Sequence, residues 1–229
     1  RGILPENAAA VTTIVSTNMA HAIAKSFGCK MVEVLTGFKY IGGEILELEN
    51  KGEEDKFIFG FEESCGYPKG TYARDKDAVV ASMLVCELAA YLKLQNKSIL
   101  DALHELYTNY GYYIAKVQNI ELTGADAMKK AAKIMSDFRE KSPKAIGGVS
   151  VSVIRDYQSR THTDVHTGEV STIDLPKSNV LEYCLETKGS VIVRPSGTEP
   201  KVKFYYTAIG CDADDAKALL NKMMLDMSK

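Results

Sequence analysis

Residues 57–79 read FIFGFEESCGYPKGTYARDKDAV, and this stretch decides how the first half of the chain is interpreted. The apolar run at 57–61 predicts a buried strand. The strand ends at two carboxylates and a hydroxyl, those of Glu62, Glu63 and Ser64. A loop rich in glycine and proline follows, and then four alternating charges at 74–77. In open α/β sheets ligands bind beyond the carboxyl ends of the strands, so this polar loop is a candidate binding loop.

The residues around this stretch alternate between predicted strands and predicted helices. Strands are expected at 12–16, 30–35 and 57–61. Helices are expected at about 18–27, 42–50 and 77–94. A further helix is expected from Ser98, because Ser98 and Asp101 resemble a capping box. The alternation predicts an α/β domain with a mixed, largely parallel sheet.

A second polar segment, Thr36-Gly37-Phe38-Lys39, follows the second predicted strand as a loop. The segment Glu62–Ser64 follows the third. Because the carboxyl ends of parallel strands meet at one edge of a sheet, we expect the two segments to form a single site.

The pattern changes after Gly111. Strands are expected at 112–122, 148–158, 190–194 and 201–209, with helices at 124–140 and 212–227 and irregular polar residues up to about Lys177. Strands that follow one another directly predict a smaller α+β domain with an antiparallel sheet and two helices. We place the two domains at 1–109 and 110–229.

The composition excludes several function classes. The chain has 229 residues, of which 45% are hydrophobic, and its net charge of −2 provides no overall field for nucleic acid or an anionic membrane. The most apolar segment, 78–92, is interrupted by Ser82 and Glu87, so it predicts a buried helix and not a membrane span. The five cysteines lack C-x-x-C spacing, which favours free thiols in the cytoplasm. The four histidines show no metal-ligand spacing, and no metal site is predicted. The absence of an initiating methionine or a leader leads us to expect a piece of a longer chain.

The stretch RPSGTEPKVKF at 194–204 is a candidate phosphate site. A guanidinium donates two parallel hydrogen bonds to phosphate, and hydroxyl and main-chain N–H groups can bind the remaining oxygens. The candidate residues are Arg194, Ser196, Gly197, Thr198 and Lys203. The alternative is a hairpin loop rich in turn formers, and Glu199 argues against an anion site. The other segments have similar alternatives: a solvated strand end at 62–64, a surface ion-pair cluster at 74–77 and a simple turn at 36–39.

The order of these motifs removes much of that ambiguity. The motifs T-G-F-K, G-F-E-E-S-x-G, R-D-K-D and R-P-S-G-T-E-P begin at residues 36, 60, 74 and 194. In this order they resemble the α-D-phosphohexomutases, most of all the bacterial phosphoglucomutase branch, with phosphomannomutases close behind. The resemblance covers essentially the whole chain. Those enzymes have four domains, and this chain is similar to the third and fourth.

The resemblance implies a role for each motif residue. The residues expected to contact the sugar are Thr36, Gly37, Phe38, Lys39, Glu62, Ser64 and Arg74. Lys76 is the candidate proton shuttle or electrostatic stabiliser. The residues expected to hold the phosphate that is not transferred are Arg194, Ser196, Gly197, Thr198 and Lys203.

The resemblance also implies a reaction, in which phosphate moves between the 1 and 6 positions of glucose through a phosphoserine and glucose 1,6-bisphosphate. The T-A-S-H-N-P stretch of the phosphoserine and the D-G-D-x-D-R stretch that binds Mg²⁺ are absent from this sequence. The expected partners are therefore a phosphosugar and the two N-terminal domains of the full-length enzyme. The chain alone is expected to be inactive.

Three alternatives stay open beside phosphoglucomutase. A phosphomannomutase or phosphopentomutase would share the same recognition loops. A non-catalytic phosphosugar-binding or regulatory module would need the loops but no catalysis. A serine hydrolase built on Ser196 is disfavoured, because the loop connects two strands and does not lead into a helix.

Overall fold

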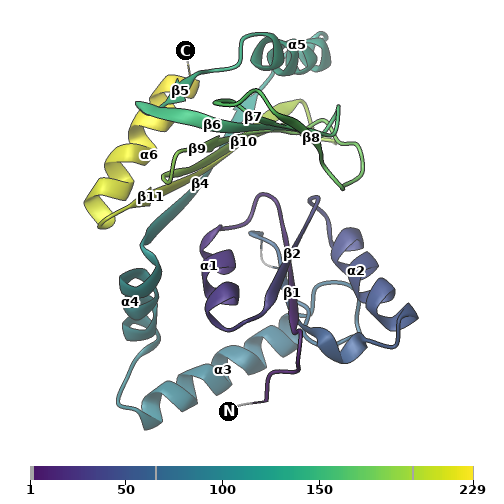
Figure 1. Ribbon diagram of the computed structural model, residues 1–229, viewed down its shortest axis with the longest axis vertical. Helices are drawn as coiled ribbons and strands as arrows, with labels where there is room; N and C mark the ends of the chain where they lie inside the picture. The colour runs from purple at the N-terminus through teal and green to yellow at the C-terminus, as the bar shows by residue number, and fades with distance from the viewer. Residues whose placement is uncertain (1–2, 65, 198, 229) are drawn as a thin grey trace. The chain divides into compact units, whose positions relative to one another are not determined.

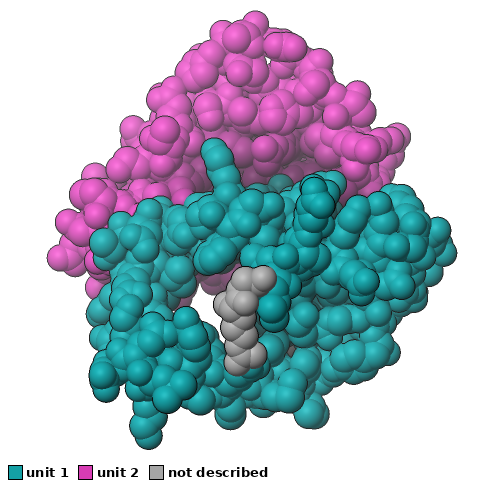
Figure 2. All heavy atoms as spheres, turned by 60° about the horizontal axis from the view of Figure 1, so that its bottom comes forward, with its two compact units in different colours: residues 1–110 teal, residues 111–229 magenta. Residues whose placement is uncertain are grey.

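The computed structural model describes residues 3–64, 66–197 and 199–228 of the chain. The chain divides into two compact units, unit 1 from Arg1 to Tyr110 and unit 2 from Gly111 to Lys229 (Figures 1 and 2). The predicted fold class, a parallel α/β sheet followed by an antiparallel α+β sheet, is confirmed.

Unit 1 contains a three-stranded sheet in the order β2-β1-β3, and both of its strand pairs are parallel. Its elements before the last two helices are β1 (Ala9–Thr13), α1 (Met19–Ser26), β2 (Lys30–Val34), α2 (Phe38–Asn50), η1 (Glu54–Lys56) and β3 (Phe57–Phe61). The first strand differs from the predicted range 12–16. It begins at the small, buried alanines and ends at Thr13, whose carbonyl accepts a turn hydrogen bond from Ser16 N–H at 2.9 Å.

Helix α2 covers one face of this sheet. Phe38, Ile41 and Ile45 of the helix pack against buried side chains of the three strands, namely Val11, Val34 and Phe57. The apolar positions of α2 recur at three- and four-residue intervals, which places them on one side of the helix. This packing fixes the start of α2 at the carboxyl edge of the sheet.

The other face of the sheet is less covered. Ala10 and Met31 alternate with Val11 and Val32, which face α2, and they line an apolar groove of about 480 Å³. The rest of the groove comes from α1, β3 and the loop after β3, through residues such as Ile23, Phe59 and Tyr67.

The last two helices of unit 1, α3 (Ala78–Leu94) and α4 (Ile99–Tyr110), correct one prediction. The apolar segment 78–92 was expected to be buried, yet Val79 is 81% exposed and Leu88 is 46% exposed. Helix α3 has apolar residues on nearly all of its sides. The high hydropathy of segment 78–92 therefore reflects its composition and does not show that the helix is buried. Among the described residues, no single helix has the length and hydropathy to cross a membrane. Helices α3 and α4 reach those values only together, with a bend of 86° between them.

The predicted capping box at the start of α4 is confirmed. Ser98 donates from its N–H and from its hydroxyl to Asp101 Oδ2, at 2.8 and 2.7 Å, and Asp101 N–H donates to Ser98 Oγ at 3.1 Å. These reciprocal bonds satisfy N–H groups that a helix start otherwise leaves without a partner.

Unit 2 contains a larger antiparallel sheet in the order β4-β11-β10-β9-β6-β7-β8, with β5 paired to β6. Its strands are β4 (Tyr112–Glu121), β5 (Ala145–Ile146), β6 (Val149–Asp156), β7 (Thr161–Asp164), β8 (Val170–Thr172), β9 (Leu181–Leu185), β10 (Gly189–Pro195) and β11 (Lys201–Gly210). Its helices are α5 (Ala127–Glu140) and α6 (Ala213–Met227). Both pack on one face of the sheet (Figure 1). The side chains buried there include Met135, Phe204 and Met223.

Unit 2 departs from its prediction in three respects. It is the longer unit, whereas a smaller domain was expected. The polar stretch up to Lys177 contains β7 and β8, whose sequences THTD and VST have too few apolar residues to give a strand signal. Strand β9 was missed, although its apolar residues Leu181, Tyr183 and Leu185 recur at every second position and are buried.

Candidate functional site

In unit 1 the segments T-G-F-K and E-E-S meet at the carboxyl edge of the sheet. They follow β2 and β3, which flank β1. Gly37 N–H donates a hydrogen bond to Glu62 Oε1 at 2.7 Å, and Glu62 is only 7% exposed. Glu62 N–H in turn donates to Gly66 C=O at 3.0 Å, which closes the loop behind the carboxylate. The two predicted segments are therefore joined by a direct bond.

The T-G-F-K segment is only partly a loop. Thr36 and Gly37 lie in a bend, but Phe38 and Lys39 form the first turn of α2, whose predicted start was residue 42. Gly37 has a φ of +126°, a conformation that L side chains rarely adopt. Such a residue lets the chain leave β2 and enter the helix at once while its N–H points at Glu62.

The third motif of unit 1, R-D-K-D, contacts the T-G-F-K segment through Lys76. Its ammonium nitrogen lies 4.4 Å from the centre of the Phe38 ring, within the range of a cation–π interaction. Gly66 packs against both residues, since a Cβ on Gly66 would overlap the ring and would lie 3.2 Å from Lys76 Cγ. All three motifs of unit 1 thus contact one another around Phe38.

The remaining unit 1 candidates are more exposed. Ser64 is exposed and donates to Glu63 Oε1 at 3.2 Å. Lys39 is also exposed, with its ammonium 4.8 Å from the centre of the Tyr40 ring. These side chains are available to a ligand.

The side chain of Arg74 is directed at another residue of unit 1 and not at a ligand position. Its guanidinium forms an ion pair with Glu49 near the end of α2, and its backbone carbonyl lies against Gly42. Sequence reasoning missed Glu49, because a glutamate on an exposed helix turn has no distinguishing signal.

Sequence reasoning also missed Gly66 and Asp77 as residues that build the site. The carboxylate of Asp77 accepts hydrogen bonds from Val79 N–H and Val80 N–H at 2.9 Å, which caps α3. Tyr72 OH also donates to this carboxylate, and this bond, followed by the backbone bonds from Val80 and Val79, holds the pKa of Asp77 below its ordinary value. The aspartate directly before an apolar helical run was the available signal.

In unit 2 the R-P-S-G-T-E-P motif connects β10 and β11. Arg194 and Lys203 are directly opposed partners in these strands, so their side chains lie on the same face of the sheet. Lys201 shares that face by alternation. Such a concentration of positive charge beside a tight loop favours an anion.

The loop itself is held by local hydrogen bonds. Ser196 N–H donates to Lys201 C=O at 2.8 Å, and Glu199 N–H donates to Ser196 Oγ at 3.3 Å. Gly197 is exposed, and an added Cβ there would meet no heavy atom within 4 Å. Thr198 lies outside the described residues.

Glu199, which argued against an anion site, is paired within the loop. Its carboxylate lies 2.6 Å from Lys201 Nζ, and this hydrogen bond lowers the pKa of Glu199. The negative charge is therefore neutralised locally, whereas Arg194 and Lys203 remain on the face beside it.

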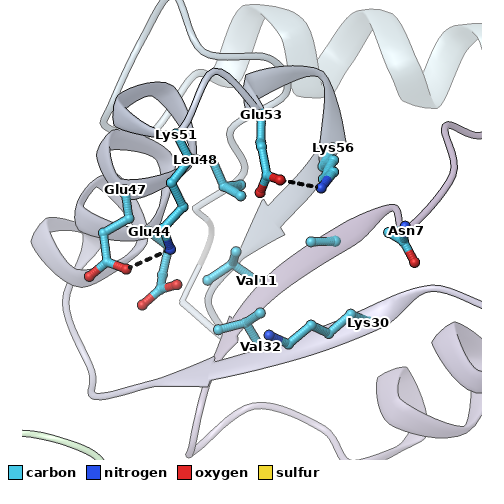
Figure 3. A pocket seen from close by; sticks show the side chains of 11 residues that line it. Asn7, Val11, Lys30, Val32, Glu44, Glu47, Leu48, Lys51, Glu53 and Lys56 are labelled. Carbon is cyan, nitrogen blue, oxygen red and sulfur yellow. Dashed lines mark hydrogen bonds and ion pairs between the residues drawn. The ribbon is translucent and has the colours of Figure 1, made fainter.

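A charged hollow of about 280 Å³ also lies in unit 1, but at the amino ends of the strands (Figure 3). It is lined by Lys30, Lys56 and Glu44 among others, and by none of the predicted site residues. Partial burial and the neighbouring Glu47 raise the pKa of Glu44. Within the described parts of the chain, no group of three or more His, Cys, Asp or Glu side chains is arranged to hold a metal ion.

Two family models match the chain. Residues 1–110 match "Phosphoglucomutase/phosphomannomutase, alpha/beta/alpha domain III", and residues 119–225 match "Phosphoglucomutase/phosphomannomutase, C-terminal domain". The boundary between the two matches falls in the same region as the boundary between the two units.

Similar proteins include two that carry the name phosphoglucomutase. One from Staphylococcus epidermidis is 38% identical over 206 residues, which are 90% of this chain and 37% of that protein. One from Staphylococcus aureus is 36% identical over 214 residues, or 93% of this chain and 38% of that protein. The chain thus spans less than two fifths of the length of these relatives.

Two solved structures share the fold. The open form of pp63/parafusin, a phosphoglucomutase from Paramecium, has a TM-score of 0.66 at 18% identity, over 96% of this chain and 37% of that one. A putative phosphomannomutase from Thermus thermophilus has a TM-score of 0.59 at 18% identity, over 97% of this chain and 37% of that one.

Proposed function

The chain belongs to the phosphoglucomutase/phosphomannomutase family, and on this premise we propose that it supplies the sugar- and phosphate-recognition loops of a phosphoglucomutase. The enzyme would interconvert glucose 1-phosphate and glucose 6-phosphate through glucose 1,6-bisphosphate. The observation that carries the proposal is the meeting of three separate motifs around Glu62, Gly37 and Lys76 at the carboxyl edge of one sheet.

The unit 1 site suits a sugar ring. A carboxylate accepts hydrogen bonds from two adjacent hydroxyls of a pyranose, and it loses one of them when an epimer reverses a hydroxyl. Glu62 uses one oxygen for Gly37 N–H, and its second oxygen can accept from a hydroxyl. Ser64 adds an exposed hydroxyl on the same loop.

The unit 2 loop suits the phosphate that stays on the sugar. Arg194 and Lys203 share one face at the end of the β10–β11 hairpin, and a guanidinium binds phosphate with two parallel hydrogen bonds. Positioning and charge stabilisation make up most of phosphoryl-transfer catalysis. This reaction therefore needs one site that binds the sugar hydroxyls and a separate site that binds the phosphate.

The phosphoserine and Mg²⁺ are assigned to other domains of the full-length enzyme. The metal would neutralise charge on the transferred phosphoryl group there. We place the enzyme in the cytoplasm, because the thiols of Cys29, Cys86 and Cys211 are free, as in proteins of reducing compartments.

A titration tests the recognition role directly. Glucose 1-phosphate added to the chain should shift the backbone amide signals of residues 36–39, 62–66 and 194–203 in a two-dimensional NMR spectrum. Arg194→Ala should weaken binding by about 1.5–3 kcal/mol, because a charged hydrogen bond is lost. Lys133→Ala is the matched control, since Lys133 pairs with Asp137 on the exposed side of α5, and it should leave affinity unchanged. Shifts confined to other surfaces would contradict the proposal.

Turnover tests the substrate. The full-length enzyme should convert glucose 1-phosphate faster than mannose 1-phosphate or ribose 1-phosphate, whereas this chain alone should convert none of them. A preference for the mannose or ribose ester would make the enzyme a phosphomannomutase or a phosphopentomutase. Turnover by the purified chain alone would refute the proposal that catalysis needs the phosphoserine and Mg²⁺ of other domains.

A further inference from the structure

The contact between Phe38 and Lys76 joins two motifs that lie far apart in the sequence. Phe38 opens α2 and is almost fully buried. Lys76 lies in the loop before α3, and its side chain is half exposed. The ammonium stands 4.4 Å from the centre of the ring, although Asp75 Oδ1 is also within 3.5 Å of it. A flexible lysine stem is therefore held between a buried ring and an exposed carboxylate.

Gly66 makes this contact possible. Its missing side chain leaves the space that the Phe38 ring and the Lys76 stem occupy together. A glycine in this tight, buried position permits the close approach of two neighbouring side chains.

The ring is also fixed to the loop after β3 through its neighbour in sequence, Gly37. Gly37 N–H is bound to Glu62, so the residue before Phe38 cannot move without breaking that bond. One short segment, Gly37-Phe38, thereby contacts Glu62 with its backbone and Lys76 with its ring.

We propose that Phe38 is a positioning residue, which holds the Lys76 ammonium in a defined place relative to the Glu62 carboxylate. The face of an aromatic ring attracts a cation and donates no proton. The ring can therefore orient Lys76 without adding a second negative charge to that of Asp75, whose Oδ1 lies 3.5 Å from the ammonium. The ammonium stays available to a phosphosugar oxygen. The catalytic consequence of this inference rests on the proposed function. The contact between Phe38 and Lys76 does not depend on it.

The first test measures the contact in this chain. Protons above a ring face resonate upfield, so the side-chain Hε protons of Lys76, assigned with Lys76→Arg, should resonate upfield of those of exposed lysines. Phe38→Leu should abolish that shift. Lys39, whose ammonium lies 4.8 Å from the Tyr40 ring on the same helix, is the internal control and should keep its own shift. Unshifted Lys76 protons in the unmodified chain would overturn the proposal.

A second variant series avoids the risk that Phe38→Leu perturbs the core. Fluorinated phenylalanines at position 38 keep the ring and its packing but weaken the negative face. In the full-length enzyme, kcat should fall stepwise with fluorination, by about two- to fivefold in total, whereas KM should change little. A kcat that is independent of fluorination would overturn the positioning role.

The two failures are distinguishable. A full-length enzyme that turns over no hexose phosphate would refute the proposed function, and the Lys76 proton shifts would still decide whether Phe38 holds the ammonium. An active enzyme with unshifted Lys76 protons would refute the inference alone.

Discussion

In unit 2, α5 and α6 pack on one face of the antiparallel sheet, and the side chains between them are almost completely buried. In unit 1, α2 packs on one face of the parallel sheet in the same way, but an apolar groove lines the other face and apolar side chains of α3 are exposed. The two units come from one chain of ordinary composition. The comparison shows that apolar content alone does not predict burial, whereas a one-sided apolar pattern does. Helix α5, with Ala131 and Met135 inward and Lys133 outward, has that pattern.

The largest effect is expected in the unit 2 core. Phe204 is 1% exposed and stacks with Tyr206 among the buried residues of the sheet. Phe204→Ala should lower the free energy of unfolding by about 3–5 kcal/mol, because it removes buried apolar surface and leaves a cavity. Urea unfolding, followed through amide signals of unit 2, measures the change. A loss below 1 kcal/mol would show that this core is not closely packed.

A smaller effect is expected at the unit 1 site. Glu62→Ala removes the acceptor of Gly37 N–H and should destabilise unit 1 by about 1–3 kcal/mol, whereas Glu62→Gln keeps a carbonyl acceptor and should cost less. Urea unfolding followed through unit 1 amide signals provides the measurement. Equal losses for the two variants would show that the charge matters and the hydrogen bond does not.

The exposed face of α3 should tolerate polar substitution. Leu88 is 46% exposed, so Leu88→Gln should change the free energy of unfolding by less than about 0.5 kcal/mol. Leu92→Gln is the matched control on the same helix, since Leu92 is buried, and it should cost more. If the two variants are equally destabilising, the face of α3 around Leu88 is covered and the contrast between the units disappears.

The smallest effect concerns Glu199 in the loop between β10 and β11. Its pKa lies below the ordinary value because Lys201 donates a hydrogen bond to it and attracts its charge. Its folded pKa is depressed, so any stabilisation is present above the unfolded pKa and is lost as pH falls through the folded pKa. Lys201→Met should raise the pKa of Glu199, measured by a ¹³C NMR titration, with little change in stability because the carboxylate of Glu199 is exposed. An unchanged pKa would mean that the pair does not form.

The sequence predicted most of the elements but not all of their environments. Strand β3 and the cap of α4 were predictable because a short apolar run and a Ser-x-x-Asp box act locally. The start of α2 was predicted four residues late, because the glycine before Phe38 suggested a continuing loop. Strands β7 and β8 were missed because their few apolar residues give no periodic signal.

The candidate site could be proposed from the sequence as a set of residues, but its contacts could not. The motifs indicated Gly37, Glu62 and Lys76 and the edge of the sheet on which two of them lie. The bond from Gly37 to Glu62 and the ring beneath Lys76 depend on tertiary geometry, which spacing along the chain does not encode. The ion pair of Arg74 with Glu49 joins residues 25 positions apart and could not be inferred from either one.

The lack of a side chain at Gly66 restricts how this loop can diverge. A methyl group at position 66 would overlap an aromatic ring at position 38. The residues at these two positions are therefore expected to vary together among homologous proteins. A homologous protein that carries alanine or a larger residue at the place of Gly66 should have a smaller side chain at the place of Phe38. Such a protein would have to hold its counterpart of Lys76 by other means.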